Sequence, residues 1–274
     1  MIKIGILTNC QSELELVDEI QQVKDFKVSG VVSRSDGGDN GNQALDELLD
    51  ATDALYVDKL VGSEIESLKS YLRRSEHVFL KKPFVSSLSG IRQLISFQQE
   101  AGSVIQIFNA CLFHQDILKL NGKLESPMLI DMEITIDEES KLEGELLNTL
   151  LFLCGTEKSD FRKIEVFGLQ GTKHSLINLH IQFVSGSIGQ LKIFTNKQKP
   201  GNCKIHIHQK DSKPICFDMS SGAKGKKSEQ NALKQFAREI KNNTGMVVSL
   251  NELFQAVSAL QEIKEKLKYP NIKL

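Results

Sequence analysis

The first 108 residues alternate short apolar runs with amphipathic segments, and this rhythm limits the folds open to the chain. The apolar runs have the length of buried strands and lie at 2–7, 28–32, 53–57, 77–80 and 103–108. Two of the segments between them begin with Ser followed three residues later by Glu, the pairing of a helix capping box. Strands separated by helices of this length predict right-handed parallel crossovers, and hence an open parallel sheet with helices on both faces.

From about residue 128 the pattern changes to longer alternating runs joined by close turns. These runs predict antiparallel hairpins, together with a short buried helix at 145–155 and terminal helices at 232–240 and 250–267. We therefore expect an α/β chain of two domains. Residues 1–120 form the domain with the parallel sheet, and residues 121–274 form an α+β domain built on a mainly antiparallel sheet.

Charge and composition exclude several classes of function. The 34 Lys and Arg residues nearly balance the 35 Asp and Glu residues, so no field exists that would attract nucleic acid or an anionic membrane. No run of apolar residues is long enough to span a membrane, and the N-terminal run lacks a cleavage site and is predicted to be a strand.

The cysteines and histidines point away from metal chemistry. The five cysteines contain no C-x-x-C pair and indicate reduced thiols in a cytoplasmic protein. His206 and His208 share a strand face but lack the third ligand of a catalytic zinc, so we expect no metal.

The stretch HVFLKKPF at 77–84 places two lysines and a proline directly after an apolar run. Ligands of open parallel sheets bind outside the carboxyl ends of the strands, so Lys81 and Lys82 are expected at the ligand-binding edge. Pro83 restricts the backbone beside them. The sequence thus predicts a small-molecule site at this edge.

The order of these motifs resembles the glucose-fructose oxidoreductase, inositol dehydrogenase and rhizopine catabolism (Gfo/Idh/MocA) family. DALYV at 53–57, a helix and HVFLKKPFVSSLSGIRQLISFQQEAG are similar to the family's strand, its Glu-Lys-Pro motif and the helix that follows. GKLESP at 122–127 and the closing segment 232–267 extend the likeness over nearly the whole chain. The resemblance implies an N-terminal Rossmann domain that binds NAD or NADP, and a second domain that carries substrate and forms a homo-oligomer through its sheet.

The resemblance also implies site residues and an activity on a sugar or cyclitol-like hydroxyl or carbonyl. Lys82 is the lysine of Glu-Lys-Pro, which assists proton transfer beside the nicotinamide, because an ammonium can stabilise an alkoxide or donate to a carbonyl. The expected cofactor-binding residues are Thr8, Asn9, Cys10, Ser33, Arg34 and Pro83, and the expected substrate residues are Asn148, Glu145 and His114.

Several positions depart from the family's pattern. Dinucleotide binding normally uses a G-x-G-x-x-G turn after the first strand, but Thr8, Cys10 and Glu13 occupy the glycine positions. A carboxylate at the start of a helix would repel a pyrophosphate. Ser33 and Arg34 are similar to the pattern that accepts a 2′-phosphate, with a solvated turn as the alternative.

The catalytic pattern departs as well. Lys81 replaces the Glu of Glu-Lys-Pro, and Asn148 and Glu145 replace the family's Asp and His. Two hypotheses therefore stay open. The chain is an NAD(P)-dependent oxidoreductase, or it is a catalytically degenerate relative, without a cofactor, that serves as a ligand-binding or dimerising module.

Overall fold

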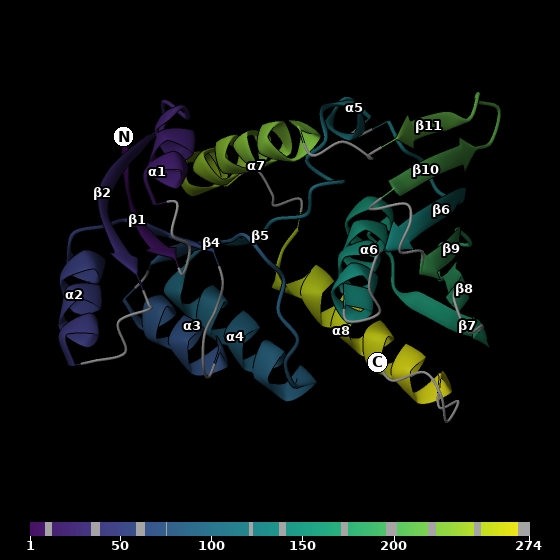
Figure 1. Cartoon of the computed structure of the whole chain (residues 1–274), viewed down its shortest axis with the longest axis horizontal. Coiled ribbons are helices and arrows are strands. Elements are labelled where there is room, and N and C mark those ends of the chain that lie inside the picture. The colour runs from purple at the N-terminus through teal and green to yellow at the C-terminus, as the bar shows by residue number, and fades with distance from the viewer. Residues whose placement is uncertain are drawn as a thin grey trace. The chain divides into compact units, whose positions relative to one another are not determined.

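The computed structural model describes residues 1–8, 13–33, 39–58, 64–74, 76–120, 123–136, 141–170, 175–195, 202–218, 223–243 and 248–267. The chain divides into two compact units (Figure 1). The first unit comprises Met1–Phe113 and Lys226–Phe254, and the second comprises His114–Gly225 and Gln255–Leu274. The predicted division at residue 120 differs from this one, because the chain returns to the first unit after residue 225.

The first unit is built on a five-stranded sheet in which every strand pair is parallel. Its strands are β1 (Ile2–Thr8), β2 (Phe26–Ser33), β3 (Ala54–Val57), β4 (His77–Leu80) and β5 (Ile105–Ile107). Their order is β2-β1-β3-β4-β5. The second strand is therefore added on one side of β1, and the third, fourth and fifth strands are added on its other side. The topological switch point, where ligands bind in such sheets, therefore lies between β1 and β3. The predicted parallel sheet is confirmed.

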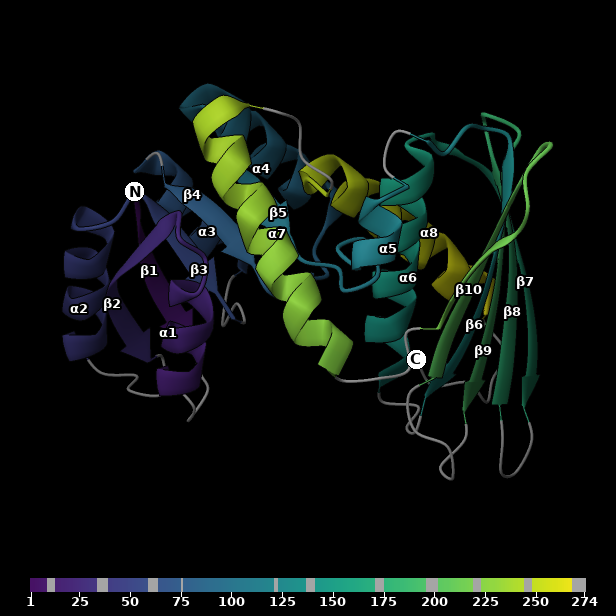
Figure 2. The same ribbon diagram turned by 90° about the horizontal axis from the view of Figure 1, so that it is seen from above.

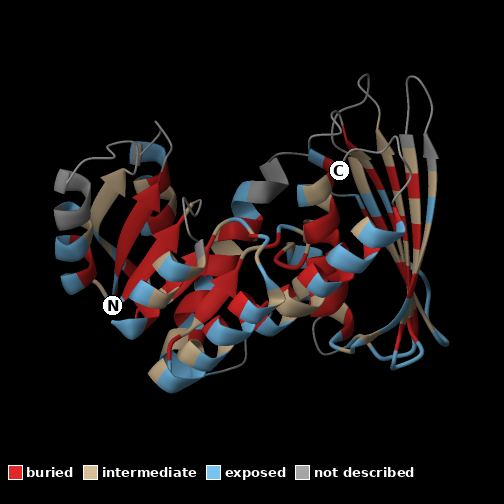
Figure 3. Cartoon of the chain, turned by 90° about the horizontal axis from the view of Figure 1, so that it is seen from below, coloured by how far each residue is buried: buried red, intermediate tan, exposed pale blue. Residues whose placement is uncertain are grey.

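Helices cover both faces of this sheet. They are α1 (Glu13–Gln21), α2 (Asp39–Asp50), α3 (Glu64–Arg73), α4 (Leu88–Ala101) and α7 (Ala223–Asn242). Helices α1 and α7 lie on one face, and α3 and α4 lie on the other (Figures 1 and 2). Strands β3 and β4 are almost wholly buried, as parallel strands covered on both faces must be (Figure 3).

Helix α7 packs on the sheet through aromatic and polar contacts. The rings of Phe79 and Phe236 have centroids 5.7 Å apart, and the Gln106 side-chain amide donates to the Ala232 carbonyl at 2.8 Å. These contacts explain why α7 belongs to the first unit, although the sequence predicted the region around 232–240 to lie in the second domain.

Helix α4 begins and ends at the residues that the sequence favours. Ser87 accepts a hydrogen bond from the Gly90 amide at 3.1 Å, and Gly102 closes the helix in the left-handed region at φ 63°. Glycine enters this region without steric cost, which explains the sharp end of the helix.

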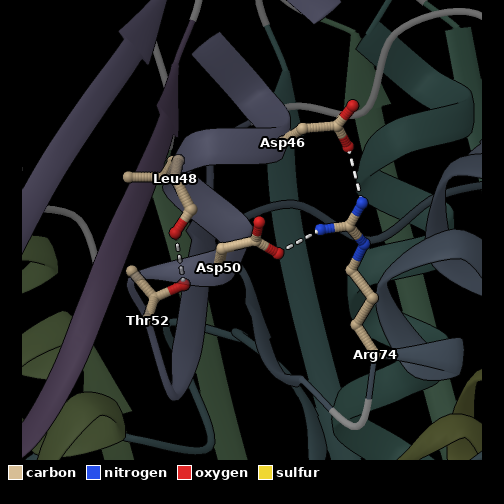
Figure 4. Close-up of polar contacts among 5 residues, drawn as sticks. All are labelled: Asp46, Leu48, Asp50, Thr52 and Arg74. Carbon is tan, nitrogen blue, oxygen red and sulfur yellow. Dashed lines mark hydrogen bonds and ion pairs between the residues drawn. The ribbon is translucent and has the colours of Figure 1, made fainter. Parts of the chain in front are cut away.

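Helix α2 approaches the opposite face of the sheet from α7, over two glycines. A Cβ added at Gly5 would lie 2.9 Å from Leu48 Cγ, and one at Gly30 would lie 2.8 Å from Leu48 Cδ1. At the surface, Arg74 pairs with Asp46 at 2.7 Å and with Asp50 at 2.8 Å (Figure 4). Exposed ion pairs contribute at most about 1 kcal/mol, so the packing of Leu48 dominates the docking of α2.

The second unit is built on a six-stranded sheet with the order β11-β10-β6-β9-β8-β7. Its strands are β6 (Met128–Ile136), β7 (Phe161–Gln170), β8 (Ser175–Phe183), β9 (Ile188–Thr195), β10 (Asn202–Gln209) and β11 (Ile215–Asp218), and its helices include α5 (Gln115–Leu118) and α6 (Leu142–Glu157). Only the β6–β9 pair is parallel, which confirms a mainly antiparallel sheet. Helix α8 (Leu250–Lys266) begins in the first unit and ends in the second.

One face of this sheet packs against helix α6. Leu153 lies against Gly189, where an added Cβ would come within 3.2 Å of its Cδ1. Strand β6 alternates buried and partly exposed residues, the pattern of a sheet with one packed face. Among the described residues, no helix combines the length and the hydropathy needed to cross a membrane.

A methyl group at Gly5 should destabilise the protein, because it would lie 2.9–3.1 Å from three carbon atoms of the Leu48 side chain and force that side chain to shift. We expect Gly5→Ala to lower the free energy of unfolding by about 1–3 kcal/mol in denaturant titration. Gly144→Ala is the matched control. That position in α6 is open, and alanine should raise helix stability there by up to about 1 kcal/mol. A Gly5→Ala protein as stable as the wild type would contradict this packing.

A buried carboxyl group at the start of β4 should make the stability depend on pH. Burial, and then the charge of Asp53, raise the pKa of Glu76 from 4.5 to about 7, and its Oε2 atom has no hydrogen-bond partner among the described residues. Because the folded-state pKa is the higher one, stability falls as the pH rises from 4.5 through 7, by up to about 3 kcal/mol. Glu76→Gln should remove this dependence in thermal melts between pH 5 and about 8. The same pH slope in both proteins would contradict it.

Candidate functional site

The ends of β1, β2, β3 and β4 lie side by side at the carboxyl edge of the parallel sheet. Thr8 and Ser33, the last residues of β1 and β2, are partners in the Cα register. Val57 and Leu80 are partners in the same way, and Asp58 and Lys81 follow them. The residues that flank the topological switch point therefore belong to the candidate site.

Four side chains form a cluster beside this edge, which we name the carboxyl-edge cluster: Tyr56, Asp58, Lys81 and Glu229. The Lys81 ammonium lies 3.5 Å from Glu229 Oε1 and 3.8 Å from Asp58 Oδ1. It also lies 5.8 Å from the centre of the Tyr56 ring, within the range of a cation–π contact. The cluster thus joins β3, β4 and α7.

Tyr56 holds the Glu229 carboxylate of the cluster in place through a hydrogen bond. Its hydroxyl donates to Glu229 Oε1, and the tyrosine is fully buried. Burial, and then the negative charge of Glu229, raise the pKa of Tyr56 well above its ordinary value. The hydroxyl therefore remains a donor throughout the physiological pH range.

Lys82, the predicted proton-transfer residue, follows directly and has different surroundings. Its side chain is exposed, and it forms no ion pair or hydrogen bond with the other described residues. Pro83 is partly buried, and Phe84 is 4% exposed and anchors the segment in the core. The two lysines thus have separate environments, and only Lys81 enters the cluster.

The predicted cofactor-binding residues are described in part. Thr8 is buried within extended strand β1, so it does not form the tight turn that the family's first glycine makes. Ser33 is partly exposed at the neighbouring strand end. Asn9, Cys10 and Arg34 lie outside the described residues.

The charge of α1 bears on whether a dinucleotide fits this edge. The helix begins at Glu13, and its sequence, ELELVDEIQ, holds acidic residues and no basic ones. Of these, Glu19 is paired with Lys226 of α7 at 2.7 Å. Of the two hydroxyl-bearing strand ends, Ser33 is partly exposed and suits a polar ligand group, whereas Thr8 is buried and an acidic helix start weakens the hold on a pyrophosphate.

The predicted substrate residues belong to the second unit. His114 accepts a hydrogen bond from the Asp116 amide through Nδ1 at 3.4 Å and caps the short helix α5. Glu145 and Asn148 are both partly exposed and lie three residues apart on α6, so they share one face of that helix. Within the described part of the chain, no three His, Cys, Asp or Glu side chains gather as a metal site requires.

Sequence reasoning missed the roles of Tyr56 and Glu229. They are 173 residues apart, and no local pattern links them. The one available signal was the acidic residue at 229 in an otherwise basic stretch, KGKKSEQ, just before the helix predicted at 232–240.

Comparison with known proteins identifies the fold. No protein-family model and no curated protein matches the chain in sequence. In structure it is similar to a myo-inositol dehydrogenase from Corynebacterium glutamicum, with a TM-score of 0.79, 9% identity and coverage of 97% of this chain and 96% of that one. It is also similar to UDP-N-acetylglucosamine 3-dehydrogenase GnnA from Acidithiobacillus ferrooxidans, with a TM-score of 0.75, 12% identity and coverage of 99% of both chains.

A third similar structure is GenD2 from gentamicin A biosynthesis, solved in complex with NAD. Its TM-score is 0.73 at 12% identity, over 96% of this chain and 93% of that one. The chain has the fold of these dehydrogenases. The resemblance to the Gfo/Idh/MocA type is thereby confirmed at the level of the fold.

Proposed function

We propose that the protein is a nicotinamide-dependent oxidoreductase of the Gfo/Idh/MocA type that acts on a hydroxyl or carbonyl group of a sugar or cyclitol. The observation that carries this proposal is the extent of the structural likeness. It covers 96–99% of this chain in comparisons with dehydrogenases of inositol and of a nucleotide sugar and with a structure that holds NAD. Both units of the chain therefore have counterparts in those proteins.

The residues of the carboxyl edge have a consistent chemistry under this proposal. A bound NAD or NADP supplies or accepts the hydride. Thr8, Asn9, Cys10 and Ser33 would hold the cofactor through hydroxyl, amide and backbone groups. Arg34 would favour a 2′-phosphate, and Pro83 would limit the backbone beside the nicotinamide.

Lys82 would transfer the proton to or from the reacting oxygen of the substrate. As an ammonium it donates to a carbonyl oxygen that gains charge, and as an amine it accepts the proton of a hydroxyl group. Its exposed side chain on an anchored segment suits this role, because the amine can reach a ligand without breaking an ion pair. Glu145, Asn148 and His114 would bind substrate hydroxyl groups.

Titration with NADPH and NADH tests the proposal directly. We expect micromolar affinity for at least one of them by calorimetry at low salt. Lys82→Ala should retain this affinity and lower turnover of the sugar or cyclitol substrate by a factor of about 10²–10⁴, the contribution of a positioned acid or base. The absence of binding heat at millimolar nucleotide would contradict cofactor binding. A fully active Lys82→Ala protein would contradict proton transfer by the lysine.

The same titration tests the effect of the acidic residue that begins α1. Glu13→Gln should tighten binding several-fold, because one charge near a helix N-terminus changes the free energy by about 0.3–1 kcal/mol. Glu100→Gln, at the exposed far end of α4, is the matched variant and should leave the affinity unchanged.

A second candidate function is a ligand-binding or dimerising module without turnover. It is favoured by Thr8, which is buried in β1 where the family has a glycine, and by the acidic residue that begins α1. Binding of a sugar without binding of either nucleotide would support this alternative.

The sheet of the second unit is the proposed surface for homo-oligomer formation. One face packs against α6, and none of the described helices of that unit covers the other (Figure 2). Across the open face, register pairing aligns His206, Asp131, Gln190, His180 and Glu165 in one row. A two-fold axis along β9 would place His206 opposite Glu165 and Asp131 opposite His180, so the row is complementary to its own copy.

Reversing one charge of this row should weaken assembly. We expect Asp131→Lys to place two basic groups opposite each other and to shift the protein towards the monomer in sedimentation velocity. Glu100→Lys, an exposed acidic residue in the first unit, should sediment like the wild type. A wild type that stays monomeric at all concentrations would contradict this surface.

A further inference from the structure

We propose that Lys81 is a positioning residue, which together with Glu229 holds the end of β4 so that Lys82 is presented to the ligand. This inference rests on the function proposed for Lys82. Lys81 stands where the family's motif has a glutamate, so the resemblance assigns it no role. The structure, however, gives it three side-chain partners among the described residues at the carboxyl edge, which are Asp58, Glu229 and the ring of Tyr56.

The backbone on both sides of Lys82 is held in place. On one side, the Lys81 amide donates to the Val57 carbonyl at 2.9 Å, which continues the β3–β4 pairing beyond Leu80. On the other side, the ring of Pro83 fixes its φ angle, and buried Phe84 anchors the chain. Lys82 is therefore an exposed side chain on a short segment that is fixed at both ends.

The side chain of Lys81 adds a charged anchor to this segment. It is 28% exposed, Asp58 is 15% exposed and Glu229 is 11% exposed, so the ion pairs are shielded from bulk water. Shielded pairs are stronger than surface pairs, and breaking one leaves a buried charge uncompensated. The segment that carries Lys82 is thus tied to β3 and to α7.

The partners of Lys81 are themselves held rigidly. The buried Tyr56 hydroxyl donates to Glu229, and its raised pKa keeps it protonated. Helix α7 is fixed to the sheet by Gln106 and by the ring of Phe236. A functional side chain needs such support, because a displacement of about 1 Å can lower a rate about 10²-fold.

The test compares Lys81→Met, Lys81→Arg and Lys241→Met in the full chain. Lys241 pairs with Asp25 at 2.5 Å at the exposed far end of α7, so its variant controls for the loss of an ion pair on the same helix. Hydrogen exchange at the backbone amides of the segment 80–84, which are those of Leu80, Lys81, Lys82 and Phe84 because proline has none, is measured by mass spectrometry and requires no substrate. We expect faster exchange in Lys81→Met and wild-type exchange in Lys81→Arg and Lys241→Met.

Kinetics then separate positioning from mere stability. We expect Lys81→Met to lower kcat by roughly 10–100-fold with an unchanged affinity for NADPH or NADH, and Lys81→Arg to recover most of the loss. Unchanged exchange at 80–84 would overturn the proposal, and so would faster exchange with an unchanged kcat. A loss that Lys81→Arg does not recover would also overturn it.

Failure of the proposed function gives a different result. A wild type without turnover, or a Lys82→Ala protein that keeps full turnover, contradicts the function assigned to Lys82. The exchange measurement then still decides whether Lys81 holds the segment, and unchanged exchange refutes the anchor itself.

Discussion

The docking of α7 on the parallel sheet is the interaction on which the candidate site depends. The helix comes from the last quarter of the chain, yet Phe236 packs on Phe79, and Glu229 accepts a hydrogen bond from the Tyr56 hydroxyl. These contacts bury one face of β3 and β4 and bring a carboxylate to the carboxyl edge of the sheet. Without α7, Lys81 would lose Glu229, one of its two acidic partners among the described residues.

Electrostatics divide the carboxyl edge into two parts. Near β3 and β4, the Lys81 ammonium forms ion pairs with the carboxylates of Asp58 and Glu229, so its positive charge is compensated within the protein. Near β1, helix α1 is acidic and opposes an anionic ligand. Lys82 is exposed and unpaired with the other described residues. Among the described residues, a ligand at this edge would therefore meet the exposed Lys82 ammonium beside a cluster in which the Lys81 ammonium is flanked by two carboxylates.

Much of the fold could be predicted from local patterns, because periodicity and capping act over a few residues. The parallel sheet followed from such signals, and the Ser and Gly that bound α4 are local signals of the same kind. The parallel β6–β9 pair could not, since alternation along a strand does not specify its distant partner. Residues 232–240 were expected in the second domain, whereas most of α7 belongs to the first unit, because its packing partners on the sheet are distant in the sequence.

The candidate site was predictable in position more than in detail. The strand order and the motif HVFLKKPF predict Lys82 at the carboxyl edge of the sheet, and in the structure it lies just beyond the end of β4. The different surroundings of Lys81 and Lys82 depend on Glu229, a contact across 148 residues that only the folded chain creates. The roles of all the predicted site residues stay predictions, and Asn9, Cys10 and Arg34 lie outside the described residues.

The most direct test of this account maps where a nicotinamide cofactor binds. Backbone amide chemical shifts of the isotope-labelled protein, followed by NMR during titration with NADPH and NADH, report on each strand end separately. The account predicts saturable shifts at Ser33, Asp58 and Lys82, on the carboxyl edge of β2, β3 and β4. Shifts at none of these amides at millimolar nucleotide, or shifts confined to the second unit, would contradict it.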